Sequence, residues 1–151
     1  NICNAIRQIV EENEKIEVVY PVHPNPAVRE IVNAVLKDCA GVHLIPPIDV
    51  LDMHNLMARS YLVVTDSGGL QEEAPALGKP VLVVRTETER PEAVEAGTVK
   101  VIGVEQNDIY QAATELLSNR AEYQRMSLAV SPYGDGHASE RIVKILLECD
   151  R

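Results

Sequence analysis

The stretch that decides the fold reads Tyr61-Leu-Val-Val-Thr65, Asp66-Ser67-Gly68-Gly69, Leu70-Gln-Glu-Glu-Ala-Pro-Ala-Leu77 and Gly78-Lys79-Pro80. Its apolar, β-branched beginning predicts a strand covered on both faces, as in a parallel sheet. A turn of small residues follows, and then a short helix that Pro75 limits and Gly78 ends. The next strand begins at once, at Val81. The stretch therefore predicts one βαβ unit of a parallel sheet.

The turn between that strand and that helix, Asp66–Gly69, is suited to an anion, and we call it the cradle turn. Asp66 and Ser67 are preferred N-cap residues, and the two glycines leave the backbone open to a ligand. Free N–H groups at a helix start point toward whatever binds there, and the helix dipole favours negative charge. Such turns also occur without a ligand, so the turn alone fits a phosphate site and a plain strand-to-helix connection equally well.

The same alternation of strands and helices continues on both sides. Apolar periodicity predicts strands at 16–20, 42–45, 61–65, 81–84 and 98–104, and helices at 1–13, 27–36, 50–58, 70–77, 109–117, 120–128 and 138–148. Residues 92–96 are expected to form only a short turn. Strands that alternate with helices form βαβ units with right-handed crossovers. We therefore predict an α/β fold: one domain, residues 1–151, with a three-layer αβα, Rossmann-like parallel sheet.

Composition excludes several classes of protein. Trp and Phe are absent, so the core must be aliphatic, and the net charge of −9 argues against non-specific nucleic-acid binding. No apolar run is long enough for a membrane span. Cys3, Cys39 and Cys149 have no metal-type spacing and indicate free thiols in the cytoplasm. Because the chain opens without Met inside a helical pattern, we interpret it as a piece of a longer protein.

The loops at the carboxyl ends of the predicted strands should meet at one edge of the sheet, where ligands bind in such folds. They bring His23, the cradle turn and the pair Arg85 and Arg90 together. An anion held by N–H groups beside Arg is a good phosphate site. Glu73, one turn into the helix, could accept two hydroxyls of a ribose.

Each of these residues also has a purely structural interpretation. The two arginines lie among glutamates and could form surface ion pairs. His23 could be a satisfied histidine of a proline loop, and His43 and His54 look structural. No Ser/His/Asp or Cys/His set and no metal cluster stands out, and no cofactor is implied. The residues alone favour nucleotide-phosphate binding over catalysis.

Several blocks together resemble the C-terminal domain of the non-hydrolysing UDP-N-acetylglucosamine 2-epimerases. The blocks are 20–26, 65–83, 88–93 with 96–98, and 132–136, and the resemblance extends over essentially the whole chain. The resemblance implies the second Rossmann-like domain of a GT-B arrangement. It also implies interconversion of UDP-GlcNAc and UDP-ManNAc through elimination and re-addition of UDP, in the supply of cell-envelope polysaccharide.

By motif, Ser67, Gly68 and Gly69 would hold the diphosphate, Glu73 the ribose hydroxyls, and Arg90 would belong to the UDP site. Two further positions carry expectations from the family: Met53 stands where relatives place an aromatic residue against the uracil, and His23 matches a histidine near a regulatory UDP-GlcNAc site. The resemblance places the acid/base carboxylates in the N-terminal domain and an active-site histidine just upstream of residue 1. It therefore implies no catalytic residue in this chain, with the missing N-terminal domain and a second subunit as partners.

Two other functions stay open on the sequence alone. The chain could be the donor-binding half of a GT-B glycosyltransferase, or a non-enzymatic αβα interaction module. The final helix could pack on this domain or, as in GT-B proteins, extend toward the other one. If it extends, Ile142, Ile145 and Leu146 should be exposed and should favour self-association.

Overall fold

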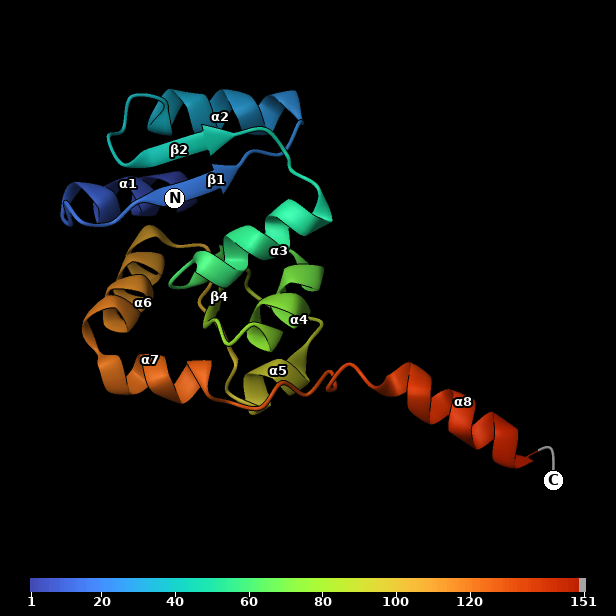
Figure 1. Ribbon diagram of the computed structural model, residues 1–151. Helices are drawn as coiled ribbons and strands as arrows, with labels where there is room; N and C mark the ends of the chain where they lie inside the picture. Colours follow the sequence, from blue (N-terminus) through green and yellow to red (C-terminus); the bar gives the residue numbers. More distant parts are fainter. Residues whose placement is uncertain (150–151) are drawn as a thin grey trace.

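The computed structural model describes residues 1–149 (Figure 1). Helices and strands alternate through the first half, and helices dominate the last third. The elements are α1 (Ile2–Glu11), β1 (Val18–Pro21), α2 (Pro26–Leu36), β2 (Val42–Ile45), α3 (Val50–Arg59), β3 (Val63–Thr65), α4 (Gly68–Ala76), β4 (Val81–Val83), α5 (Pro91–Glu95), β5 (Val99–Val101), α6 (Gln106–Ser118), α7 (Arg120–Ser127) and α8 (Ala138–Cys149).

All strand pairs are parallel, as predicted, but the hydrogen-bonded ladders fall into two groups. β1 pairs with β2 from Val18 opposite Val42, and a second sheet has the order β3-β4-β5. In the described residues no ladder joins β1 to β3, so one continuous sheet was a wrong expectation. Side-chain packing makes the connection instead, because Ala5 and Ile9 of α1 belong to the same buried cluster as Leu82 of β4.

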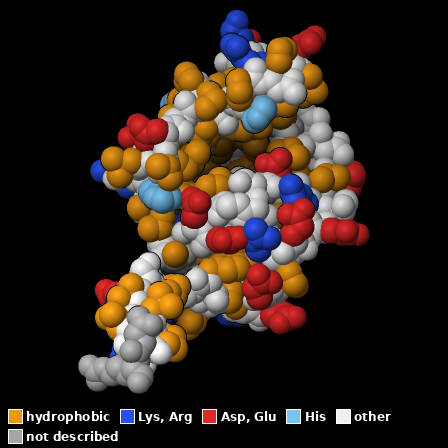
Figure 2. All heavy atoms as spheres, turned by 90° about the vertical axis from the view of Figure 1, so that its right-hand side faces the viewer, with side chains coloured by type: hydrophobic (Ala, Val, Ile, Leu, Met, Phe, Trp, Pro, Cys, Tyr) orange, Lys and Arg blue, Asp and Glu red, His pale blue; other side chains and the backbone are white. Residues whose placement is uncertain are grey.

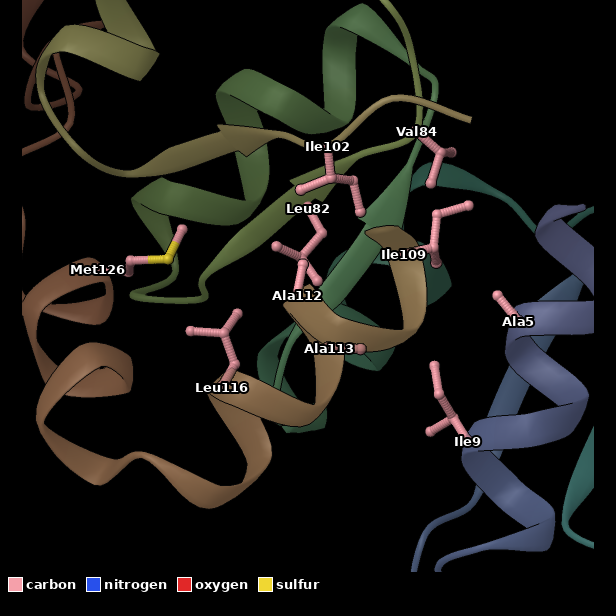
Figure 3. Packing of buried hydrophobic residues seen from close by; sticks show 10 residues of the cluster. All are labelled: Ala5, Ile9, Leu82, Val84, Ile102, Ile109, Ala112, Ala113, Leu116 and Met126. Atoms are coloured by element: carbon pink, nitrogen blue, oxygen red, sulfur yellow. The ribbon is translucent and has the colours of Figure 1, made fainter. Parts of the chain in front are cut away.

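The central strand β4 separates two hydrophobic clusters. Leu82 and Val84 face one side, where α1, α6 and α7 cover them (Figure 3). Val81 and Val83 face the other, where Met57, Ala74 and Ala93 come from α3, α4 and α5. Alternate residues of a strand point to opposite faces, so a strand that is fully buried, as β4 is, must have cover on both. The predicted three-layer αβα architecture is confirmed.

The cradle turn leads into α4 earlier than the sequence indicates. The helix begins at Gly68, not Leu70, with Ser67 at the N-cap, so both glycines form its first turn. Its end is as predicted: Gly78 has φ 69° and donates its N–H to the Pro75 carbonyl at 2.9 Å. Lys79 N–H reaches the Ala74 carbonyl at 3.1 Å, which completes a Schellman cap.

Helix α8 extends away from the rest of the molecule (Figure 1). None of its residues is buried, and Ile142, Ile145 and Leu146 are 57–61% exposed. The extended placement that the sequence left open is therefore the observed one. Among the described residues, no helix is long and apolar enough to cross a membrane.

Candidate functional site

The candidate site lies beside the cradle turn, at the carboxyl end of β3. Figure 2 shows the side of the molecule toward which β1 and β2 point, with a hollow bordered by hydrophobic side chains and with histidine, arginine and acidic side chains nearby. Carboxyl edges of parallel sheets are where ligands bind in α/β folds. The position of the turn is therefore the one expected of a binding site.

The first turn of α4 has unused donors and open space. Ser67 makes no side-chain cap hydrogen bond, and its own N–H donates to Thr65 Oγ1 at 3.0 Å. The first N–H groups of a helix have no intrahelical acceptor. Neither Gly68 nor Gly69 has a positive φ, so the backbone does not require glycine there. The glycines instead keep the space above those N–H groups free of side chains.

Arg90 lies next to this turn. Its Nε donates to the Glu72 carboxylate, and its Nη1 donates to the Glu89 carbonyl at 3.1 Å. Its Nη2 faces α4, because a Cβ built on Gly68 would lie 3.9 Å from it. The hydrogen bond with Glu72 raises the pKa of the Arg90 guanidinium, which is in any case always a cation in proteins. A negative group at the glycine turn would therefore meet both N–H groups and a fixed positive charge.

The loop that carries Arg90 is anchored by a buried amide. Gln71 is 1% exposed, and its Oε1 accepts a hydrogen bond from Thr88 Oγ1 at 2.7 Å. Thr88 Oγ1 in turn accepts from the Arg90 N–H at 3.1 Å. Neither Gln71 nor Thr88 was singled out from the sequence. These bonds connect α4 to the loop after β4 and hold the Arg90 backbone in place.

Glu73 lies on the same helix, one turn from the glycines. Its Oε1 would be 3.5 Å from a Cβ on Gly69, so the carboxylate borders the open space. Its Oε2 is 3.0 Å from Nε2 of His54. His54, which looked structural on the sequence, thus lies beside Glu73 at the candidate site. Met53, next to His54 on α3, is partly buried against the cluster under α4.

The other predicted rim residues, His23 and Arg85, pair with residues of their own loops. His23 is exposed, and its Nδ1 accepts the Asn25 N–H at 3.2 Å within its own loop. Arg85 Nη1 lies 3.4 Å from Glu89 Oε1 in an exposed ion pair. This is the surface ion pair that the sequence offered as the alternative to a phosphate-binding role. A hollow of about 430 Å³ beside Arg85 is also lined by Asp66, Glu87 and Glu89. The lining of this hollow therefore has three carboxylates and one arginine, and one of the carboxylates, Asp66, belongs to the cradle turn.

Tyr133, from the glycine-rich segment before α8, packs against the cluster that α4 and α5 share. Burial raises the pKa of its phenol, and the nearby carboxylates of Glu92 and Glu72 raise it further. The aromatic ring therefore packs this segment against the cluster to which α4 and α5 contribute. It was part of a recognised sequence block, but its place in the core was not predicted.

Comparison with known proteins gives one consistent family. The family model described as UDP-N-acetylglucosamine 2-epimerase matches residues 1–147. A relative from Thermotoga maritima is 63% identical over 147 residues, which are 97% of this chain and 39% of the relative. The UDP-N-acetylglucosamine 2-epimerase of Bacillus subtilis is 57% identical over 147 residues, again 97% and 39% of the two chains.

Solved structures agree with this result. The UDP-GlcNAc 2-epimerase of Neisseria meningitidis, in a crystal structure bound to UDP-GlcNAc, superposes with a TM-score of 0.90 at 44% identity. The match covers 97% of this chain and 40% of that one. The chain thus spans about 39% of the length of the relatives named above.

Proposed function

The chain belongs to the UDP-N-acetylglucosamine 2-epimerase family, and we propose that it is the UDP-binding part of an enzyme that interconverts UDP-GlcNAc and UDP-ManNAc. The observation that carries this proposal is the first turn of α4: two glycines that the backbone does not require, with Arg90 Nη2 beside Gly68. A diphosphate has the charge that such a helix start and a fixed guanidinium attract.

The proposed reaction explains why the anion must be held firmly. In the elimination, the C1–O bond of the sugar breaks, the C2 proton is removed, and UDP departs with the bonding electrons. In the re-addition, the same UDP oxygen attacks C1 while C2 is protonated on the opposite face. UDP is therefore leaving group and nucleophile in turn. Donors aimed at its diphosphate stabilise the charge that develops there.

The remaining assignments follow the same site. Ser67, Gly68 and Gly69 would hold the diphosphate with Arg90, and Glu73 would accept the ribose hydroxyls. Met53 would cover a face of the uracil with its thioether. His23, which lies on a separate exposed loop, would belong to a regulatory UDP-GlcNAc site.

We further propose that residues 1–151 form one UDP-binding domain and that the acid/base groups belong to an N-terminal domain of the complete enzyme. The complete enzyme would be a homodimer. Its place would be the cytoplasm, which agrees with the three free thiols Cys3, Cys39 and Cys149. This chain alone would bind UDP weakly and would not epimerise UDP-GlcNAc.

A calorimetric titration of the chain with UDP tests the proposal. We expect saturable binding that Gly69→Val abolishes and that Ser67→Ala and Arg90→Met weaken. Arg7→Met is the matched control, because Arg7 is also paired with a glutamate, Glu11, but on the exposed face of α1. Absence of binding at millimolar UDP, or equal binding by wild type and Gly69→Val, would contradict the proposed site. Epimerisation by the chain alone would contradict the placement of the acid/base groups.

A further inference from the structure

We propose that His54 is a positioning residue that fixes the Glu73 carboxylate for recognition of the nucleotide ribose. The inference rests on the proposed function, because it concerns the same UDP site. Its basis is the bond of 3.0 Å between His54 Nε2 and Glu73 Oε2, which joins α3 to α4. These two helices are in contact, and Figure 1 shows them side by side.

The bond leaves part of the carboxylate available. An ionised carboxylate can only accept, so the imidazole Nε2 must donate its proton to Oε2. The other oxygen, Oε1, lies on the Gly69 side of the carboxylate and borders the open space over the first turn of α4. Two carboxylate oxygens have about four acceptor positions, and His54 occupies one of them. Enough remain for the two neighbouring hydroxyls of a ribose.

The bond also restricts a flexible side chain. Glu has several rotatable bonds, and ordering it for a ligand has an entropic cost that is added to the cost of binding. The side chain of Glu73 is 41% exposed and that of His54 45% exposed. Without the bond to His54, the Glu73 carboxylate would therefore be free to change rotamer. A partner on a neighbouring helix holds it in one position before the nucleotide arrives.

Two other His–Glu pairs of the chain can be compared with the His54–Glu73 pair. His43 and Glu17 are 3.5 Å apart and more exposed, and they lie at the β1–β2 sheet. His137 and Glu140 are three residues apart at the start of α8. Neither pair borders the glycine turn. His43 thus offers a matched control: the same residue type, with the same kind of partner, outside the site.

The experiment compares UDP with 2′-deoxy-UDP in calorimetric titrations of the chain. The variants are His54→Leu, His54→Gln, Glu73→Gln and the control His43→Leu. For wild type we expect UDP to bind about tenfold more tightly than 2′-deoxy-UDP, since a hydrogen bond to a charged acceptor is lost. His54→Leu should bring that ratio close to one. His54→Gln, which keeps a donor, should retain most of it, and His43→Leu should not change it.

The outcomes separate this inference from the proposed function. An unchanged ratio in His54→Leu, or an equal loss of affinity for both nucleotides, would overturn the positioning role while the UDP site stands. An unchanged ratio in Glu73→Gln, or no binding of UDP by wild type, would overturn the ribose assignment and the inference with it. Unfolding midpoints of all variants, compared with wild type, show whether each one is folded.

Discussion

Helices α4 and α8 show opposite relations between sequence pattern and burial. Helix α4 is rich in small residues and has no broad apolar stripe, yet it buries Gln71, Ala74 and Pro75. Helix α8 has a run of large aliphatic residues, and none of them is buried. The region that looks less hydrophobic is therefore the better packed one.

The difference shows that an apolar stripe on a helix indicates a face suited to burial. It does not indicate which segment buries that face. The small residues of α4 let the helix lie close to β4 on one side and leave space for a ligand on the other. The stripe of α8 has no cover among the described residues. Short connections determine where α4 packs, since β3, α4 and β4 follow one another directly in the sequence.

The largest expected effect is a contrast between two leucines. Leu82 of β4 is 0% exposed, whereas Leu146 of α8 is 61% exposed. Leu82→Ala removes buried methylene groups and leaves a cavity, so we expect it to lower the free energy of unfolding by about 3 kcal/mol. Leu146→Ala should change it by less than about 0.5 kcal/mol. Urea unfolding measures both, and similar losses would mean that α8 has cover in solution.

The next effect concerns the buried amide of α4. Thr88→Val removes the hydrogen-bond partner that Gln71 Oε1 has among the described residues, and also the acceptor of the Arg90 N–H. A buried acceptor without a partner destabilises by about 1–3 kcal/mol. We expect a loss in that range from urea unfolding, together with weaker UDP binding. Thr86→Val is the control, because Thr86 lies in the same loop and is exposed. If both valines behave alike, Gln71 does not anchor the loop.

Gly69→Ala should separate stability from binding. A Cβ at this position would make ordinary contacts, at 3.5 Å from Glu73 Oε1 and 3.9 Å from Ser67 Oγ. Because alanine is favoured over glycine in helices, the free energy of unfolding should rise by about 0.5 kcal/mol. UDP affinity should fall about tenfold, since the methyl group occupies the ligand space.

Gly103 provides the contrasting case for that substitution. It has open space around it but φ 72°, so alanine there should lower the free energy of unfolding by about 1 kcal/mol. UDP binding should not change. If Gly69→Ala also lowers stability and leaves UDP affinity unchanged, its glycine serves the fold and not a ligand.

The features that were predictable from the sequence are those that depend on residues close together in the chain. The βαβ stretch, the αL glycine at Gly78 and the apolar residues of α8 depend on neighbours in the chain, and all were predicted correctly. The strand expected at 98–104 is only Val99–Val101, because the positive φ of Gly103 ends the extended conformation. The expected start of α6 was late, since its first turn, from Gln106, is polar.

The candidate site was only partly predictable, because its supporting bonds join distant segments. The glycine turn and Arg90 are visible as a local motif. The partners Glu72 with Arg90, Gln71 with Thr88 and His54 with Glu73 are separated by 17 to 19 residues and meet only through the fold. An amide, a hydroxyl or an imidazole gives no sequence signal of which distant group it will meet. The residues that would touch a ligand could be named, but not those that hold them.

The smallest expected effect tests whether α8 forms its own local structure. Arg141 donates to both oxygens of Asp135, at 2.8 and 2.6 Å, and these hydrogen bonds lower the pKa of Asp135 below its ordinary value. A carboxyl with a lowered pKa in the folded state adds stability above its ordinary pKa, and that stability is lost as pH falls through the lowered value. Helical signal from α8 should therefore decrease only at strongly acidic pH.

In Arg141→Met the helical signal of α8 should decrease at a higher pH, closer to the ordinary pKa of aspartate. The NMR chemical shift of the Asp135 carboxyl should report the same rise in its pKa. Arg125→Met is the control, because Arg125 lowers the pKa of Glu122 on α7 and does not contact Asp135. A shift at Asp135 with no change at α4 would show that α8 is ordered by its own N-terminal contacts. An unchanged Asp135 titration would mean that the ion pair is not formed in solution, and that the start of α8 depends on the Asp135 hydrogen bond from His137 N–H.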